Sequence, residues 1–165
     1  MPTFYLDTSA LLKKYKTEQG SEVIAELFDS KKVGEYFVTS MLTLIETYGV
    51  ARRMLKNNDL TDQTFRLLLG NINRDLNETV PANKITEDVV YYATEYSREH
   101  GLKSSDSLHL GSATVLKQHG FPEPFYFLTS DKDLKSAAKQ VDFEVLDPQE
   151  QDSLARLRSC RSSSV

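Results

Sequence analysis

Short runs of consecutive hydrophobic residues alternate along the chain with longer stretches in which hydrophobic residues recur every three or four positions. The first pattern is typical of buried β-strands, and the second of helices with one apolar face. Strands are predicted at residues 3–6, 36–39, 125–129 and 143–146, and helices at 10–16, 23–28, 41–56, 61–78, 87–100, 106–119 and 133–140. Short strands that alternate with helices predict an α/β fold with a mostly parallel central sheet.

The length and composition of the chain fit one domain with its own core. It has 165 residues, of which 39% are hydrophobic, enough for a core without disulfide or metal support. The composition changes only at the end, where Arg156, Arg158 and Arg161 occur without nearby acidic residues and three serines follow. We therefore expect a domain over residues 1–150 and a flexible C-terminal tail over residues 151–165.

The charge and the cysteine content exclude some classes of protein. Lysine and arginine number 20 against 24 acidic residues, so the net charge of −4 excludes a wholly basic nucleic-acid-binding surface but not a local basic patch. The single cysteine, Cys160, rules out an intramolecular disulfide and indicates a reducing compartment. Neither a secretion signal nor a long apolar segment is recognisable. We expect a cytoplasmic protein without a membrane span.

Four acidic residues occupy positions typical of a site at the edge of a parallel sheet. Asp7 and Asp131 each follow a predicted strand, Asp106 begins a predicted helix, and Glu46 lies in a helix among apolar neighbours. Taken singly, such residues are usually helix caps or solvated side chains. Because parallel strands end at one edge of the sheet, however, the four together predict one acidic site.

Carboxylates gathered in one place repel each other unless a proton or a cation neutralises them. Oxygen ligands, without cysteine or histidine at zinc spacing, suit Mg²⁺ or Mn²⁺. Such ions promote the cleavage of phosphodiester bonds. The sequence therefore predicts a metal site that is formed by Asp7, Glu46, Asp106 and Asp131 and is suited to this reaction.

Four segments of the chain resemble the PIN-domain ribonucleases, and among these the VapC toxins of toxin–antitoxin pairs. They are LDTSALLKKY at 6–15, TLIE at 43–46, SSDSLHLGSA at 104–113 and LTSDKDL at 128–134, and the likeness covers about residues 2–147. The resemblance implies a PIN-like, Rossmann-like three-layer sandwich in which the four acids bind Mg²⁺ or Mn²⁺ and cleave RNA. It also implies accessory roles for the hydroxyls of Thr8 and Thr129 and for Asp133.

The resemblance also implies a cognate antitoxin that folds onto the toxin and blocks its acidic site. Apolar stripes at residues 65–76 and 91–96 leave two explanations open, core packing or the surface of a homodimer or of the antitoxin complex. Two basic clusters follow the first two acids and are equally well explained as RNA-binding or solvated: Lys13 and Lys14, and Arg52, Arg53 and Lys56. His109 is expected to be a packed helix histidine rather than a general base.

We therefore predict a Mg²⁺- or Mn²⁺-dependent endoribonuclease that acts as the toxin of a type II toxin–antitoxin pair. Two alternatives stay open: a non-toxin PIN-domain nuclease in RNA maturation or decay, and a catalytically inactive module that binds RNA or protein. A phosphoryl-transfer enzyme with Asp7 as its nucleophile is disfavoured. The motif of such enzymes requires a second aspartate at the position where this chain has Ser9.

Overall fold

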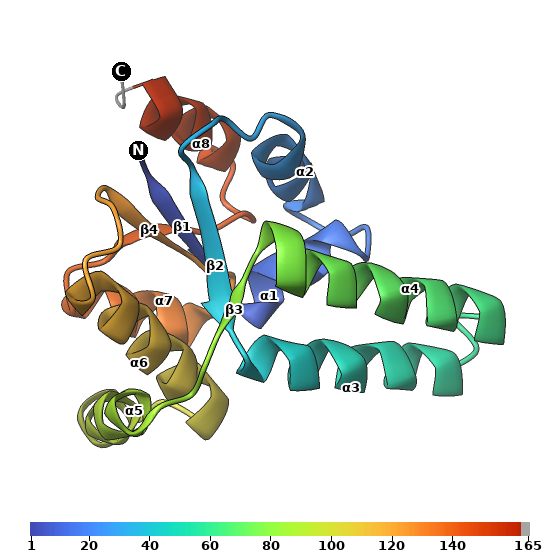
Figure 1. Cartoon of the computed structure of the whole chain (residues 1–165), viewed down its shortest axis with the longest axis horizontal. Helices are drawn as coiled ribbons and strands as arrows, with labels where there is room; N and C mark the ends of the chain where they lie inside the picture. The colour runs from blue at the N-terminus through green and yellow to red at the C-terminus, as the bar shows by residue number, and fades with distance from the viewer. Residues whose placement is uncertain (163–165) are drawn as a thin grey trace.

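The computed structural model describes residues 1–162 and contains one five-stranded sheet (Figure 1). The strands lie in the order β3-β2-β1-β4-β5, and each neighbouring pair is parallel. Their bounds are β1 Thr3–Leu6, β2 Tyr36–Ser40, β3 Ala82–Asn83, β4 Phe125–Leu128 and β5 Glu144–Leu146. The predicted α/β fold with a parallel central sheet is confirmed.

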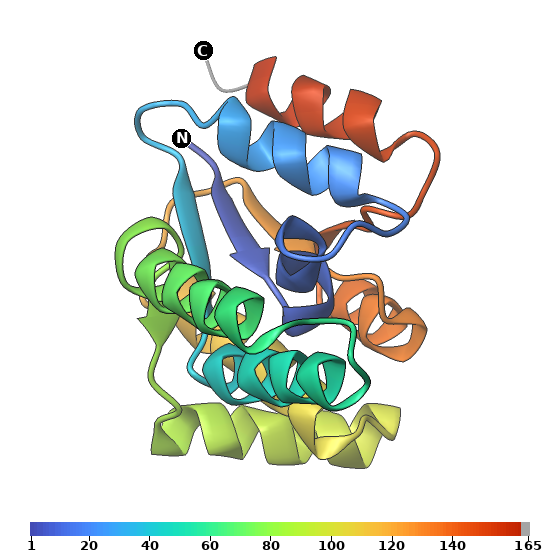
Figure 2. The ribbon, with the colours of Figure 1, turned by 90° about the vertical axis from the view of Figure 1, so that its right-hand side faces the viewer.

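Helices cover both faces of the sheet. They are α1 Thr8–Leu11, the 3₁₀ turn η1 Leu12–Lys14, α2 Ser21–Asp29, α3 Leu42–Lys56, α4 Asp62–Arg74, the π turn η2 Asp75–Thr79, α5 Glu87–His100, α6 Ser104–Gln118, α7 Lys132–Gln140 and α8 Ser153–Ser162. Helices α2 and α8 lie together on one side of the sheet, and α5 and α6 lie on the other (Figures 1 and 2). The paired helices α3 and α4 extend to one side, beyond the carboxyl ends of β1 and β2.

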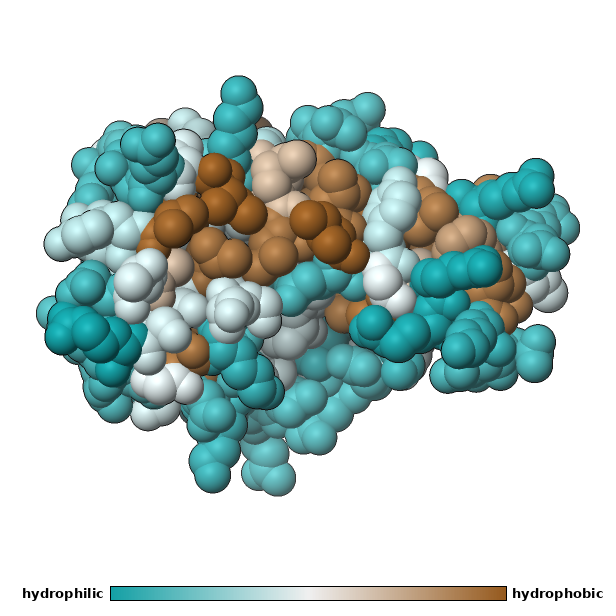
Figure 3. All heavy atoms as spheres, turned by 90° about the horizontal axis from the view of Figure 1, so that it is seen from below, coloured by the Kyte–Doolittle hydropathy of each residue, from teal (hydrophilic) through white to brown (hydrophobic). Residues whose placement is uncertain are grey.

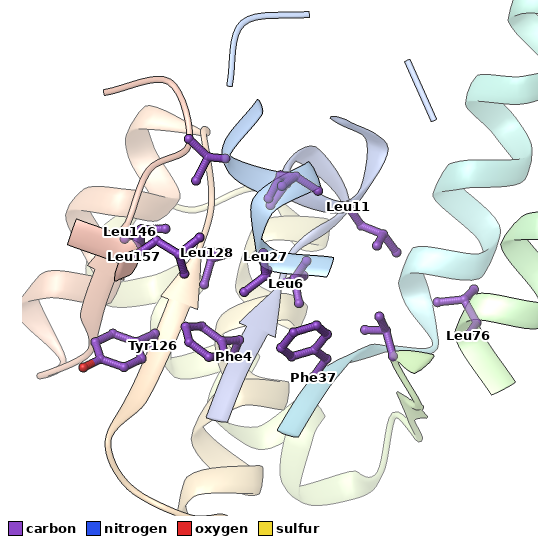
Figure 4. Packing of buried hydrophobic residues seen from close by; sticks show 14 of the residues in the cluster. Phe4, Leu6, Leu11, Leu27, Phe37, Leu76, Tyr126, Leu128, Leu146 and Leu157 are labelled. Carbon is purple, nitrogen blue, oxygen red and sulfur yellow. The ribbon is translucent and has the colours of Figure 1, made fainter. Parts of the chain in front are cut away.

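Alternate side chains of the central strands build two separate apolar clusters, one on each face of the sheet. Phe4 and Leu6 of β1 belong to the cluster that contacts α2 and α8 (Figure 4), whereas Tyr5 belongs to the cluster under α6 and α7. The Phe4 ring stacks on Tyr126 of β4 at 5.3 Å between centroids, and Tyr5 stacks on Phe127 at 5.1 Å. Burial on both faces explains why these strands are continuous apolar runs in the sequence.

The close packing of α5 against α6 requires a glycine at position 111. A Cβ atom on Gly111 would lie 2.7 Å from the carbonyl oxygen of Val89, so a larger residue would push α5 away from α6.

Within residues 1–162, no helix combines the length and the apolar character needed to cross a membrane.

The C-terminal segment is a packed helix, so the prediction of a flexible tail is wrong for residues 153–162. Leu157 of α8 is fully buried in the cluster shown in Figure 4. The Arg161 guanidinium donates to both carboxylate oxygens of Glu35, at 2.8 and 2.7 Å, and to the carbonyl oxygens of Glu26 and Leu27 at 3.2 and 2.7 Å. Arg161 therefore has partners that are distant in sequence. Residues 163–165, which complete the predicted tail, lie outside the described residues.

The structure differs from the prediction in two further places, at residues 61–78 and at residues 82–83. The helix predicted at 61–78 ends at Arg74 and continues as the π turn η2. The short strand β3 was not predicted; it pairs only Ala82 with Thr39 and Asn83 with Ser40. Two polar or small residues carry no strand pattern that a sequence could reveal.

Candidate functional site

Asp7 lies directly after β1, and its side chain caps α1. Its Oδ1 accepts hydrogen bonds from the Ala10 amide and the Ser9 hydroxyl, both at 2.8 Å, and its Oδ2 accepts one from the Thr129 hydroxyl at 2.7 Å. The residue is only 3% exposed. Burial raises the pKa of the Asp7 carboxyl above its ordinary value, although the nearby His109 and these hydrogen bonds act in the opposite direction.

Asp131 follows β4 and caps α7 in a similar way. Its Oδ1 accepts from the amides of Asp133 and Leu134 at 3.0 and 2.9 Å. The Asp131 amide donates to the Thr129 hydroxyl at 3.0 Å, and the same hydroxyl donates to Asp7. Thr129, which is fully buried, therefore links the two strand-end acids at the carboxyl edge of the sheet.

Asp106 lies in the first turn of α6 and is half-buried. Burial raises the pKa of its carboxyl, and the negative charges of Asp131 and Asp7 raise it further; the positive charge of Lys103 and the nearby His109 act against them. Asp106 is thus close enough to both other aspartates to experience their charge. Of the four predicted acids, Asp7 and Asp131 are joined through Thr129 at one end of the sheet.

Glu46 reaches the same region from α3. The Thr8 hydroxyl donates a short hydrogen bond to its Oε2, and Nε2 of His109 lies 3.1 Å from the same oxygen. Burial alone would raise the pKa of Glu46, but the hydrogen bonds of His109 and Thr8 outweigh it, and the pKa is lowered. Glu46 is therefore ionised at neutral pH. His109 is buried, as predicted, but its contact with Glu46 was not predicted.

The donor set of this site fits a divalent cation in chemistry. All four acids supply hard oxygen ligands, and a cation would relieve the repulsion that raises the pKa of Asp106. As the side chains stand, no three or more His, Cys, Asp or Glu residues among 1–162 are arranged to hold a metal ion. Helix capping by Asp7 and Asp131 occupies one oxygen of each. The four-ligand metal site stays a prediction.

The residues predicted to assist the site or to bind RNA differ in how far their side chains are exposed and paired. Asp133 is exposed and touches Asp131 through its backbone amide. The Lys13 side chain is 2% exposed and its ammonium lies 2.7 Å from Glu18, so it cannot reach a phosphate without leaving a buried position. The Lys14 ammonium lies 2.6 Å from Asp75. The prediction that these two lysines bind RNA has no support from their placement.

The second basic cluster is placed differently. Arg52, Arg53 and Lys56 are exposed on α3, six to ten residues beyond Glu46 on the same helix. A contact between these residues and RNA stays a prediction.

A cavity of about 400 Å³ opens beside Asp131, between η1, α3 and α4. Ser9, Ser130 and Asp131 form its polar end, and its apolar wall consists of Val50, Ala51, Met54, Leu68 and Ile72. The stripe at 65–76 therefore contributes partly to this wall and partly, through Ile72 and Leu76, to the core. The sequence did not reveal the cavity, because two helices that are separated by a turn form it jointly.

A second apolar surface lies on the face formed by α3, α5 and α6. Hydrophobic side chains gather in a band across this face (Figure 3). Exposed hydrophobic residues of these elements are Ile45, Val90 and Tyr91, which are 69%, 49% and 64% exposed. Tyr96, at the other end of the predicted stripe, is buried against α6 and belongs to the core.

The parallel sheet, with acids at its carboxyl edge, defines the class of this protein. Residues 4–140 match the model of the PIN domain, and the chain belongs to this family. Two relatives are the proteins named Ribonuclease VapC45 and Ribonuclease VapC49 from two strains of Mycobacterium tuberculosis. Each is 29% identical over 123 residues, which cover 73% of this chain and 81% of the relative.

Solved structures share the fold over almost their whole length. VapBC-1 from nontypeable Haemophilus influenzae superposes with a TM-score of 0.62 at 15% identity, over 90% of this chain and 99% of the other. FitAcB from Neisseria gonorrhoeae gives 0.58 at 17% identity, over 88% and 97%. A toxin–antitoxin complex from Klebsiella pneumoniae gives 0.57 at 17% identity, over 88% and 98%. These likenesses confirm the predicted PIN-like sandwich.

Proposed function

We propose that this chain is a Mg²⁺- or Mn²⁺-dependent endoribonuclease and the toxin of a toxin–antitoxin pair. The single observation that carries the proposal is that the Thr129 hydroxyl joins Asp7 and Asp131, the two acids that follow β1 and β4, at the carboxyl edge of the sheet. The two relatives named Ribonuclease VapC support the reaction, and the Klebsiella pneumoniae toxin–antitoxin complex supports the biological role.

The three aspartates would hold the cation, with Glu46 beside them. When bound, a divalent cation supplies positive charge to the phosphodiester and lowers the pKa of water. The Thr129 hydroxyl fixes the orientation of Asp7 relative to Asp131. Glu46, which is ionised and 29% exposed, can accept a hydrogen bond from the attacking water and orient it.

RNA binding needs local positive charge, because the net charge of −4 provides no general attraction. Arg52, Arg53 and Lys56 supply such charge on the exposed face of α3. A nuclease of this kind would act on RNA in the cytoplasm.

A cognate antitoxin would have to cover the acidic edge. A guanidinium can pair with carboxylates in place of a cation, and Asp131 lies at the polar end of the cavity, next to its apolar wall. Lys13, Lys16 and Glu18 also line the cavity. We expect an antitoxin segment that carries an arginine beside apolar side chains. Whether two copies of the toxin associate through one of the apolar stripes at 65–76 and 91–96 stays a prediction, tested by measuring the mass of the protein in solution.

Two experiments test the proposal. Purified protein should cut single-stranded RNA in Mg²⁺ or Mn²⁺ and stop when EDTA is added. Expression of the chain alone in bacteria should arrest growth, the Asp7→Asn variant should not, and co-expression of a neighbouring small gene should restore growth. Cleavage without growth arrest would favour the non-toxin nuclease. Binding of RNA without cleavage in either metal would favour the inactive binding module.

A further inference from the structure

His109 connects the centre of the sheet to the acidic edge. It is 2% exposed on α6, and its Nδ1 lies 3.0 Å from the Tyr5 hydroxyl of β1. Its Nε2 lies 3.1 Å from Oε2 of Glu46 and 3.1 Å from the Thr8 hydroxyl. One buried ring therefore contacts residues of β1, α1 and α3.

The hydrogen-bonding partners of His109 indicate which of its two ring nitrogens carries the hydrogen. An ionised carboxylate only accepts hydrogen bonds, so Nε2, which faces Glu46, must carry a hydrogen and donate it. Tyr5 is completely buried, and its hydroxyl lies 3.0 Å from Nδ1. A phenol hydroxyl can donate to a ring nitrogen that carries no hydrogen, so Nδ1 is the acceptor of this contact.

A second contact reaches the same oxygen of Glu46. The Thr8 hydroxyl donates to Oε2 and lies 3.3 Å from the Thr43 hydroxyl. The hydroxyls of Thr43 and Thr39 are 2.7 Å apart, and Thr39 donates to the carbonyl oxygen of Leu6 at 2.6 Å. Because the Thr43 hydroxyl has a single hydrogen, it can donate to only one of these two neighbours. His109 and Thr8 therefore contact Oε2 from two different elements, α6 and α1.

We propose that His109 is a positioning residue that, together with Thr8, holds Glu46 by Oε2 in the orientation that RNA cleavage requires. A free glutamate side chain has several rotamers, and fixing it from two directions removes that freedom before substrate binds. The inference rests on the proposed function and adds to it a residue that touches neither substrate nor cation.

A double-mutant cycle tests whether His109 acts through Glu46. His109→Leu keeps the volume of the side chain but removes its donor, and we expect kcat to fall about 10- to 100-fold with KM for a short RNA unchanged within about twofold. In a Glu46→Gln background, the same change should cost less than about twofold. An unchanged kcat, or losses that multiply in full in the double variant, would overturn the proposal.

Two further variants separate positioning from general destabilisation. His109→Gln retains an N–H donor and should recover several-fold of the kcat lost in His109→Leu. His119→Leu, at the exposed end of the same helix, is the matched control and should keep the wild-type kcat. If His109→Leu does not fold, Tyr5→Phe carries the test: kcat should fall with KM unchanged, and an unchanged kcat would contradict the proposal.

A spectroscopic measurement tests the contact without any activity. The protein has three histidines, so the ring ¹⁵N signals that disappear in His109→Gln identify His109. We expect a ring that carries its hydrogen on Nε2, and a signal that shifts in Glu46→Gln but not in Asp62→Asn. A ring protonated on Nδ1 alone would overturn the inference. Absence of cleavage by the wild-type protein would instead refute the proposed function and leave this measurement valid.

Discussion

Two glutamates at opposite ends of β2 are bound to basic side chains in contrasting ways. Glu35, just before the strand, and Arg161 have side chains that are only 3% and 5% exposed, and two hydrogen bonds join them. Two backbone carbonyls complete the partners of the guanidinium. Glu46, beyond the other end of the strand, is 29% exposed and is held through one oxygen by His109 and Thr8.

The contrast between these two glutamates distinguishes a structural ion pair, at the amino end of β2, from a candidate functional site at the carboxyl end. At the amino end, each charge is matched and further hydrogen bonds satisfy the remaining donors, which is the arrangement that stabilises a buried ion pair. At the carboxyl end, acids outnumber nearby bases, and the pKa values of Asp7 and Asp106 are raised. Burial is the main cause for both acids, and raised pKa values of this kind are frequent at functional sites.

The largest effect is expected from removing a single carboxylate at the carboxyl end. Asp7→Asn and Asp106→Asn should each lower the rate of RNA cleavage by at least about 100-fold, because each variant loses an oxygen ligand of the proposed cation site. The exposed Asp62→Asn variant is the control and should cut RNA at the wild-type rate. A gel-based cleavage assay measures all three. Wild-type rates in both site variants would leave Asp7 as a helix cap and Asp106 as an acid of the first turn of α6, without a part in cleavage.

Removing one partner of the amino-end pair should destabilise the fold instead. Arg161→Ala leaves Glu35 charged and buried, so we expect the free energy of unfolding to fall by about 3–5 kcal/mol. Arg98→Ala, which breaks an exposed pair with Glu95, should leave the free energy of unfolding almost unchanged. Urea denaturation measures the free energy of unfolding of both variants. Equal losses would contradict the assignment of the Arg161–Glu35 pair as a buried structural pair.

Two acids of the carboxyl end, Asp106 and Glu46, can be distinguished by the pH dependence of stability without metal. The raised pKa of Asp106 makes its ionisation costly in the folded state, and this cost is complete above the folded pKa and absent below the unfolded value of about 3.9. Asp106→Asn should therefore melt at or above the wild-type temperature near pH 8, with the difference vanishing towards pH 4. Thermal melts in EDTA measure this difference.

Glu46 provides a control of opposite sign in the same melts. Its pKa is lowered, so its charge stabilises the fold above the unfolded pKa of about 4.3, and this stability is lost as the pH falls through the folded pKa. Glu46→Gln should melt below the wild type at neutral pH, and the gap should close in acid. The same sign in both variants would refute the assignment of a raised pKa to Asp106 and a lowered pKa to Glu46.

The smallest effect concerns RNA binding. Replacing Arg52, Arg53 and Lys56 together with alanine should weaken binding and reduce the slope of log K against log salt by up to about one unit per lost phosphate contact. Lys32→Ala, an exposed change near the amino end of β2, should leave the slope unchanged. Binding titrations at several salt concentrations give both slopes. An unchanged slope in the triple variant would assign the cluster to a solvated face.

The sequence predicted features whose signal is local. Strands β1, β2, β4 and β5 are apolar runs because both faces of the sheet are buried, and Asp7 and Asp131 were predicted to meet because parallel strands end at one edge. Helix α8 was missed because Arg161 finds its partner 126 residues away. The role of His109 was missed for the same reason, since its partners Tyr5 and Glu46 lie 104 and 63 residues away.

Direct measurement of cation binding tests the central claim that the carboxyl edge of the sheet is a metal site. Mn²⁺ can be titrated by calorimetry into the wild type, Asp7→Asn, Asp106→Asn and the control Asp62→Asn. We predict saturable binding to the wild type and the control, and at least about tenfold weaker binding to both site variants. Equal binding by all four proteins, or no binding by the wild type, would contradict the account.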